Sequence, residues 1–131
     1  TAHEPDYFER ANENILVTLI LETAEAVENL EEICSVPGID GISLGPADLG
    51  AALGHDPLVR VHPDIEAVAA KMIEVGKKTG VAMGISARTR AEIQRRLDEG
   101  FLMINYGADY ALLAALAREG IKSFRDATSA G

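Results

Sequence analysis

Two carboxylates, Glu22 and Asp48, stand where two apolar segments of the chain end. Glu22 directly follows the apolar run 15–21, and Asp48 comes four residues after the run 39–44. A pair of neighbouring carboxylates is a typical binding site for Mg²⁺, Mn²⁺ or a similar hard cation. The residue types leave two structural roles open, because Glu22 could cap a helix N-terminus and Asp48 could form an Asx-turn.

The turn Gly45-Pro46-Ala47-Asp48 follows the second apolar run. A Gly-Pro turn that opens a short helix leaves the backbone N–H groups of Ala47 and Asp48 without acceptors inside the helix. Such groups suit a carboxylate ligand, helped by the helix dipole. An ordinary connection between a strand and a helix has the same composition, so the turn alone leaves both interpretations open.

Other reactive side chains carry weaker signals. His62-Pro63 is typical of a helix start rather than of a metal ligand, and no pair of histidines has the i, i+4 spacing of a zinc-binding helix. Neither a Gly-x-Ser-x-Gly nucleophile motif nor a Gly-Lys-Ser/Thr phosphate-binding loop occurs. Cys34 is the only cysteine and has apolar neighbours, so we expect a buried thiol and no intrachain disulfide.

Short apolar runs alternate with amphipathic segments along the chain. The pattern predicts strands at 15–21, 39–44, 81–85 and 101–104, and helices at 24–35, 49–53, 63–80, 86–100 and 110–118, with a further helical turn at 121–126. This alternation predicts an α/β fold with a parallel sheet. Right-handed crossovers then bring all strand carboxyl ends to one edge, where we expect Glu22, Asp48, Ser86 and Asn105. A flavodoxin-like receiver or binding domain has the same alternation and is the other fold considered.

Composition narrows the classes of function. The chain has 131 residues and a formal net charge of −9, which argues against nucleic acid and anionic membranes as partners. No apolar run approaches the ~20 residues of a membrane span, and no signal peptide is visible, so we expect a cytoplasmic protein. We expect residues 1–131 to form a single α/β domain, with a polar lead-in at 1–14 and a frayed tail at 127–131.

The segment 21–54 closely resembles the HpcH/HpaI aldolase family. That family comprises class II, metal-dependent aldolases that act on 2-oxo acids, and it belongs to the phosphoenolpyruvate/pyruvate-binding TIM barrels. The resemblance rests on four motifs, which are Leu21-Glu22-Thr23, Ala26-Val27-x-Asn29, Val36-Pro37-Gly38-Ile39-Asp40-Gly41 and Gly45-Pro46-Ala47-Asp48-Leu49. Residues 62–109 also match, with looser motifs.

The resemblance implies a fold and a chemistry. The four βα units resemble strands 5–8 of the barrel, and Glu22 and Asp48 match the two protein ligands of a divalent cation such as Mg²⁺, Mn²⁺ or Co²⁺. Gly45, Pro46, Ala47 and Asp48 match the residues that hold the carboxylate of pyruvate. The implied reaction is aldol cleavage or condensation of a 2-oxo acid through the pyruvate enolate, with an aldehyde as the second substrate. Lyases acting on coenzyme A thioesters belong to the same barrel family and are the alternative within this class.

Two departures limit what the resemblance implies. Ile20 stands where the hydroxyheptanedioate aldolase branch has a substrate-contacting Gln, and Gly50 stands in place of a Ser. A complete barrel has eight βα units and about 250 residues, and the family's base His and substrate-binding Arg belong to the first half. We therefore identify no catalytic residue in this chain. We expect a C-terminal half-barrel fragment that forms a homo-oligomer or needs the N-terminal half-barrel. A non-catalytic metal- and pyruvate-binding or assembly module is the alternative.

Overall fold

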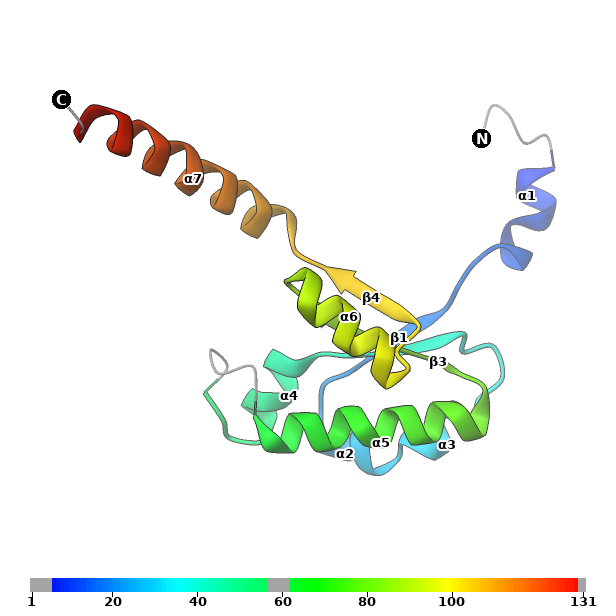
Figure 1. The fold of residues 1–131 in the computed structure, drawn as a ribbon. Helices are drawn as coiled ribbons and strands as arrows, with labels where there is room; N and C mark the ends of the chain where they lie inside the picture. Colours follow the sequence, from blue (N-terminus) through cyan, green and yellow to red (C-terminus); the bar gives the residue numbers. More distant parts are fainter. Residues whose placement is uncertain (1–5, 57–61, 130–131) are drawn as a thin grey trace.

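Four parallel strands form one sheet in the computed structural model, which describes residues 6–56 and 62–129 (Figure 1). The strands are β1 (Thr18–Leu21), β2 (Gly41–Leu44), β3 (Ala82–Ala87) and β4 (Met103–Tyr106). The helices are α1 (Tyr7–Arg10), the 3-10 turn η1 (Ala11–Glu13), α2 (Ala24–Glu28), α3 (Leu30–Cys34), α4 (Pro46–Ala52), α5 (Pro63–Thr79), α6 (Arg90–Glu99) and α7 (Asp109–Ser129).

The strands lie side by side in their order along the chain, β1-β2-β3-β4, and every neighbouring pair is parallel. The predicted α/β fold with a parallel sheet is therefore confirmed. A flavodoxin-like sheet would place one strand out of sequence order, so the order of these four strands argues for the barrel type instead.

Helices cover one face of the sheet and form the core with it. Alternate strand residues such as Leu21, Ile42 and Ile85 are buried there, beneath the apolar side of α5, which contributes Met72 and Val75. The opposite face carries Ile20, whose relative exposure is 64%, together with small residues of the central strands. The face opposite the helices is therefore open at β1, whereas Ser43 and Gly84 of the central strands are buried on that face, where the side chain of Met103 packs against Gly84.

Several helix ends have the local signals that the sequence contains. Thr23 accepts a hydrogen bond from the N–H of Ala26 and so caps α2 as expected. Thr89 and Glu92 form a reciprocal capping box at the start of α6. Gly80 is the C-cap that follows α5. Its φ of 80° lies in the left-handed region that glycine adopts without steric cost. Residues that favour helix ends therefore set one boundary each of α2, α5 and α6.

The first strand and the first crossover helix differ from the prediction. The strand begins at Thr18 rather than Ile15, because its partner β2 begins at Gly41, the residue opposite Thr18. The N–H of Val17, just before the strand, donates to the carboxylate of Asp40 at 2.7 Å. The helix predicted over 24–35 is two helices separated at Asn29. The polar lead-in contains the short helices α1 and η1, and residues 1–5 lie outside the described part of the chain.

The C-terminal helix also differs. The prediction of a helix at 110–118, a turn at 121–126 and a frayed tail is wrong, since α7 runs without a break through Gly120 to Ser129. A single Gly costs about 1 kcal/mol in a helix interior, and the Ala, Leu and Arg residues around it favour the helix. Residues 130–131 of the predicted tail lie outside the described residues.

Helix α7 extends away from the sheet (Figure 1), and none of its described residues is buried. Its exposed apolar side chains include Tyr110, Leu113, Leu116 and Phe124. Among the helices that the structure describes, α7 included, none combines the length and apolar character that a membrane crossing needs.

Candidate active site

The carboxyl ends of β1 and β2 bring the predicted site residues together. The two strands pair in parallel with Leu21 opposite Leu44, so Glu22 and Gly45 are the next residues across from each other. The N–H of Gly45 donates to the carbonyl oxygen of Leu21 at 3.0 Å and continues the ladder by one bond. This pairing fixes where the first carboxylate lies relative to the turn that carries the second.

The side chain of Glu22 packs directly against Gly45. A Cβ atom built on Gly45 would lie 2.6 Å from Cγ and 2.8 Å from Oε1 of Glu22, far inside van der Waals contact. The φ of Gly45 is −96°, a value open to any residue, so the requirement for glycine at this position comes from the approach of Glu22. The strand-end carboxylate therefore lies against the first residue of the Gly45–Asp48 turn.

The turn itself is the start of α4. Gly45 is its N-cap, Pro46 is its first residue, and Asp48 lies in its first turn. The first backbone bond back into the turn is the N–H of Leu49 to the carbonyl of Gly45, at 2.9 Å, which leaves the N–H groups of Ala47 and Asp48 without acceptors in the helix. Gly45 offers no side chain to cap them.

Burial holds this short helix in place. Leu49 and Gly50 are buried against the core, whereas Asp48 is exposed and Glu22 is half-buried. Asp48 lies in the first turn of α4, where the helix dipole favours a negative charge. The arrangement therefore presents two carboxylates and two backbone donors at one edge of the sheet.

The two structural roles considered for these carboxylates are not seen. Thr23, not Glu22, caps α2. Within residues 6–56 and 62–129, neither Glu22 nor Asp48 has a side-chain hydrogen bond or an ion-pair partner. Both carboxylates are thus available to an external cation, and a donor set made only of oxygens fits Mg²⁺ or Mn²⁺.

Two other residues predicted at this edge lie at the carboxyl ends of the next two strands. Ser86 and Asn105 are the penultimate residues of β3 and β4 and pair with each other across the sheet. The amide of Asn105 donates to the hydroxyl of Ser43 at 3.1 Å. The two predicted strands ended two residues too early, because the apolar pattern stops at Ile85 and Ile104 while the ladder continues.

His62 starts a helix and Cys34 is buried, as predicted. His62 is the N-cap of α5, and its ring accepts a hydrogen bond from the N–H of Asp64. Cys34 is buried, and burial raises the pKa of its thiol. The sequence did not indicate that Gly45 must lack a Cβ. That requirement became visible only from the strand register, which places this residue opposite Glu22.

The fold and this edge define a class of protein, since consecutive parallel strands with a site at their carboxyl ends are typical of enzymes built on βα barrels. The family model HpcH/HpaI aldolase/citrate lyase matches residues 1–115. A solved HpcH/HpaI aldolase/citrate lyase family protein from Burkholderia cenocepacia has a TM-score of 0.82 and 36% identity, over 92% of this chain and 47% of that one. The chain belongs to the HpcH/HpaI aldolase/citrate lyase family.

Curated relatives agree with this assignment. A 4-hydroxy-2-oxo-heptane-1,7-dioate aldolase of Klebsiella pneumoniae is 38% identical over 110 residues, which are 84% of this chain and 41% of the relative. A hydroxypyruvate/pyruvate aldolase of Paraburkholderia phytofirmans is 33% identical over 92% of this chain and 46% of the relative. The chain therefore spans less than half the length of these two curated relatives.

Proposed function

We propose that this chain is the metal-binding half of a class II aldolase that acts on 2-oxo acids through the pyruvate enolate. One observation carries the proposal, namely the packing of Glu22 against Gly45 across the end of β1 and β2. That packing draws a strand-end carboxylate to the turn that holds Asp48, and both carboxylates have no partner among the described residues. Membership of an aldolase family supports the same conclusion.

Each residue of the edge has a proposed role. Glu22 and Asp48 bind a divalent cation, with Mg²⁺ or Mn²⁺ as the first candidates and Co²⁺ as a substitute. The N–H groups of Ala47 and Asp48, next to Gly45 and Pro46, bind and orient the carboxylate of pyruvate. When bound, the cation supplies Lewis-acid polarisation of the 2-oxo group. The aldehyde is the second substrate, and Ile20, exposed on the face that Glu22 continues, gives its pocket an apolar wall.

Titration calorimetry with Mn²⁺ tests the metal site. We expect the wild-type chain to bind Mn²⁺ and the double variant Glu22→Ala, Asp48→Ala to lose that binding. Glu25→Ala, which removes an exposed carboxylate from the adjacent helix α2, is the matched control and should retain it. Equal Mn²⁺ affinity in the wild type and the double variant would contradict the assignment of these two ligands.

A second candidate function, which uses the same two carboxylates, is a module that binds metal and pyruvate without turnover. The chain covers 41% and 46% of the two aldolases compared above. Exchange of the pyruvate methyl protons with deuterium, followed by NMR, separates the two functions. Exchange by the chain alone indicates the aldolase chemistry, whereas metal and pyruvate binding without exchange indicates the module.

We also propose that the assembled protein covers the open side of the sheet, either with an N-terminal half-barrel or with a second copy of the chain. The exposed side chains of Ile20 and Leu16 and the apolar residues of α7 support this. Light scattering of the purified chain, with and without the complementary half, measures which assembly forms.

A further inference from the structure

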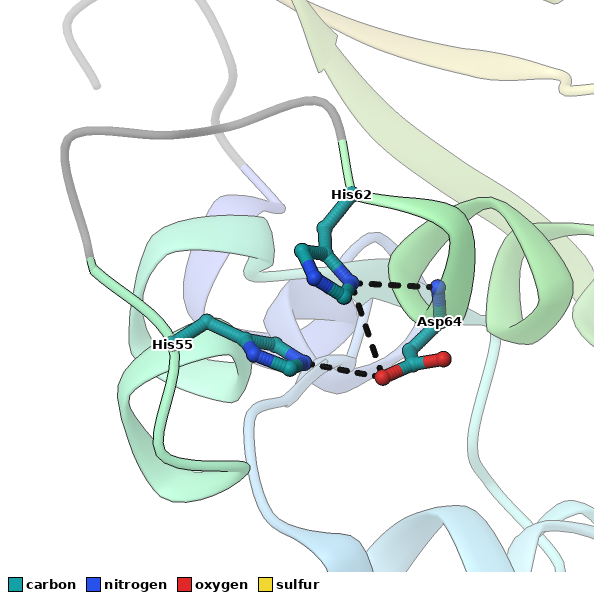
Figure 2. Close-up of side chains that lie close together, drawn as sticks. All are labelled: His55, His62 and Asp64. Atoms are coloured by element: carbon teal, nitrogen blue, oxygen red, sulfur yellow. Dashed lines mark hydrogen bonds and ion pairs between the residues drawn. The ribbon is translucent and has the colours of Figure 1, made fainter.

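Two histidines and an aspartate converge at the ends of helices α4 and α5, outside the edge described above (Figure 2). Nε2 of His55 lies 2.9 Å from Oδ2 of Asp64, and Nδ1 of His62 lies 3.5 Å from the same oxygen. The two imidazole rings are stacked, with centroids 3.6 Å apart. The donor atoms of all three side chains lie within 4.8 Å of one another.

Helix capping places both histidines. Helix α4 ends in a Schellman motif, in which Gly54 has a φ of 80° and donates to the carbonyl of Ala51 at 3.0 Å, while the N–H of His55 donates to Gly50 at 2.8 Å. These bonds anchor the backbone of His55 at the end of α4. His62 is the N-cap of α5, and Asp64 lies in the first turn of that helix. The three side chains therefore come from two anchored helix ends.

The hydrogen bonds determine which ring nitrogen carries a lone pair. The backbone N–H of Asp64 donates to Nδ1 of His62 at 3.4 Å, so this nitrogen is an acceptor. It cannot also donate to the Asp64 carboxylate, although the two atoms are only 3.5 Å apart. Nε2 of His55 donates to that carboxylate at 2.9 Å. A divalent cation would replace the proton on Nε2 of His55 and the long bond to Nδ1 of His62, and would pair with the Asp64 oxygen.

We propose that His55, His62 and Asp64 form a second divalent-metal site, selective for Zn²⁺ and similar borderline metals over Mg²⁺. Two imidazoles and one carboxylate are a donor set of catalytic and structural zinc sites, with water in the fourth position. In tetrahedral coordination with bonds of about 2.0–2.1 Å, ligand atoms lie roughly 3.3 Å apart. The observed separations of 2.9 and 3.5 Å from Asp64 are close to that value, and the two stacked rings, whose centroids are 3.6 Å apart, would have to tilt apart to direct both nitrogens at one ion.

The charges around the three side chains favour the binding of a cation. Asp64 supplies a full negative charge, and His55 follows the C-terminal end of α4, where the helix dipole is negative. The positive end of the α5 dipole opposes the metal, but its partial charge is smaller than that of the carboxylate. The site is distinct in chemistry from the oxygen-only pair Glu22 and Asp48, so the two proposals can fail separately.

Titration of the chain with Co²⁺, followed by its visible ligand-field absorption, tests the site without an activity assay. We expect a four-coordinate Co²⁺ spectrum in the wild type that Zn²⁺ abolishes and excess Mg²⁺ does not. His62→Asn removes the imidazole and keeps a good N-cap, and His55→Gln removes the other ring. Each variant should bind Co²⁺ at least about tenfold more weakly. If far-UV circular dichroism shows that one variant is unfolded, the other decides the result.

Two controls locate the binding. Glu22→Gln with Asp48→Asn should keep the Co²⁺ spectrum, and His3→Gln, which changes the remaining histidine of the chain, should leave the affinity unchanged. A wild-type chain without a four-coordinate spectrum, or variants of His55 and His62 with wild-type Co²⁺ affinity, would overturn the proposal.

Discussion

Replacing Gly45 with alanine is the sharpest perturbation of the sheet-edge site, because it adds one methyl group at a known distance. The new Cβ would lie 2.6 Å from Cγ of Glu22, whereas ordinary contact begins at 3.4 Å. The two carbons must therefore separate by about 0.8 Å. Cγ is near the backbone of Glu22, so the whole carboxylate moves with it. The backbone of residue 45 accepts alanine, since its φ is −96°.

We expect Gly45→Ala to weaken Mn²⁺ binding by about 10- to 100-fold, or roughly 1.4 to 2.7 kcal/mol. A displacement of about 1 Å at a positioned group has an effect of this order. Titration calorimetry measures the affinity, and urea unfolding measures stability in the same sample. The metal affinity should fall more than the stability, because Glu22 can swing out of the site and relieve the clash.

Gly50→Ala is the matched control within the same helix. Gly50 is buried, and a Cβ added there meets no heavy atom within 4 Å. Alanine in a helix interior is about 0.5–1 kcal/mol more favourable than glycine, so this variant should be slightly more stable and bind Mn²⁺ like the wild type. If Gly45→Ala binds Mn²⁺ as tightly as Gly50→Ala, then Glu22 is not a metal ligand in the position that the structure gives it.

Three further predictions concern the scaffold. Thr89→Ala removes the capping box with Glu92 and should lower the free energy of unfolding by about 1 kcal/mol in urea titration; no change would mean that α6 does not need its cap. The hydrogen bond from Arg96 holds the pKa of Glu66 below its ordinary 4.5, so the stability from this pair is present above pH 4.5 and is lost as the pH falls through the lowered pKa. Glu66→Gln should therefore lose less stability than the wild type between pH 7 and pH 3, and equal losses would refute the pairing. Burial raises the pKa of Cys34, so thiol reagents at pH 8 should modify it far more slowly in the folded chain than in urea, and equal rates would contradict its burial.

Periodicity predicted the elements well where burial alone decides them. The run 39–44 and the segment from Pro63 to Gly80 appear as β2 and α5 with nearly the predicted bounds, since each has a strong apolar pattern and clear ends. Prediction failed where a boundary depends on a neighbouring strand. The strand β1 begins at Thr18 because its partner β2 begins at Gly41, and the apolar run 15–21 does not indicate where that partner starts.

The order of the strands, rather than closeness in the sequence, brings Glu22 next to the turn that holds Asp48. Adjacency of Glu22 and the Gly45 turn followed from the expectation that consecutive parallel strands are neighbours, and the observed strand order agrees with it. The His55 cluster could not be foreseen in the same way. His55 and Asp64 are nine positions apart in the sequence, and their approach depends on how α4 and α5 pack rather than on any local pattern.

The two clusters differ in the softness of their donors, and this difference makes the metal assignments separable. Glu22 and Asp48 offer only oxygens, which suit Mg²⁺ and Mn²⁺, whereas His55 and His62 add nitrogen lone pairs that Mg²⁺ uses poorly. Zn²⁺ binds most nitrogen and oxygen sites more tightly than Mn²⁺ does, so a zinc titration alone would fill both clusters. When Mn²⁺ is added first, it binds the carboxylate pair, and Co²⁺ added afterwards binds the site with the two imidazoles. Two sequential binding events, each abolished by a different pair of substitutions, are the result that these two donor sets require.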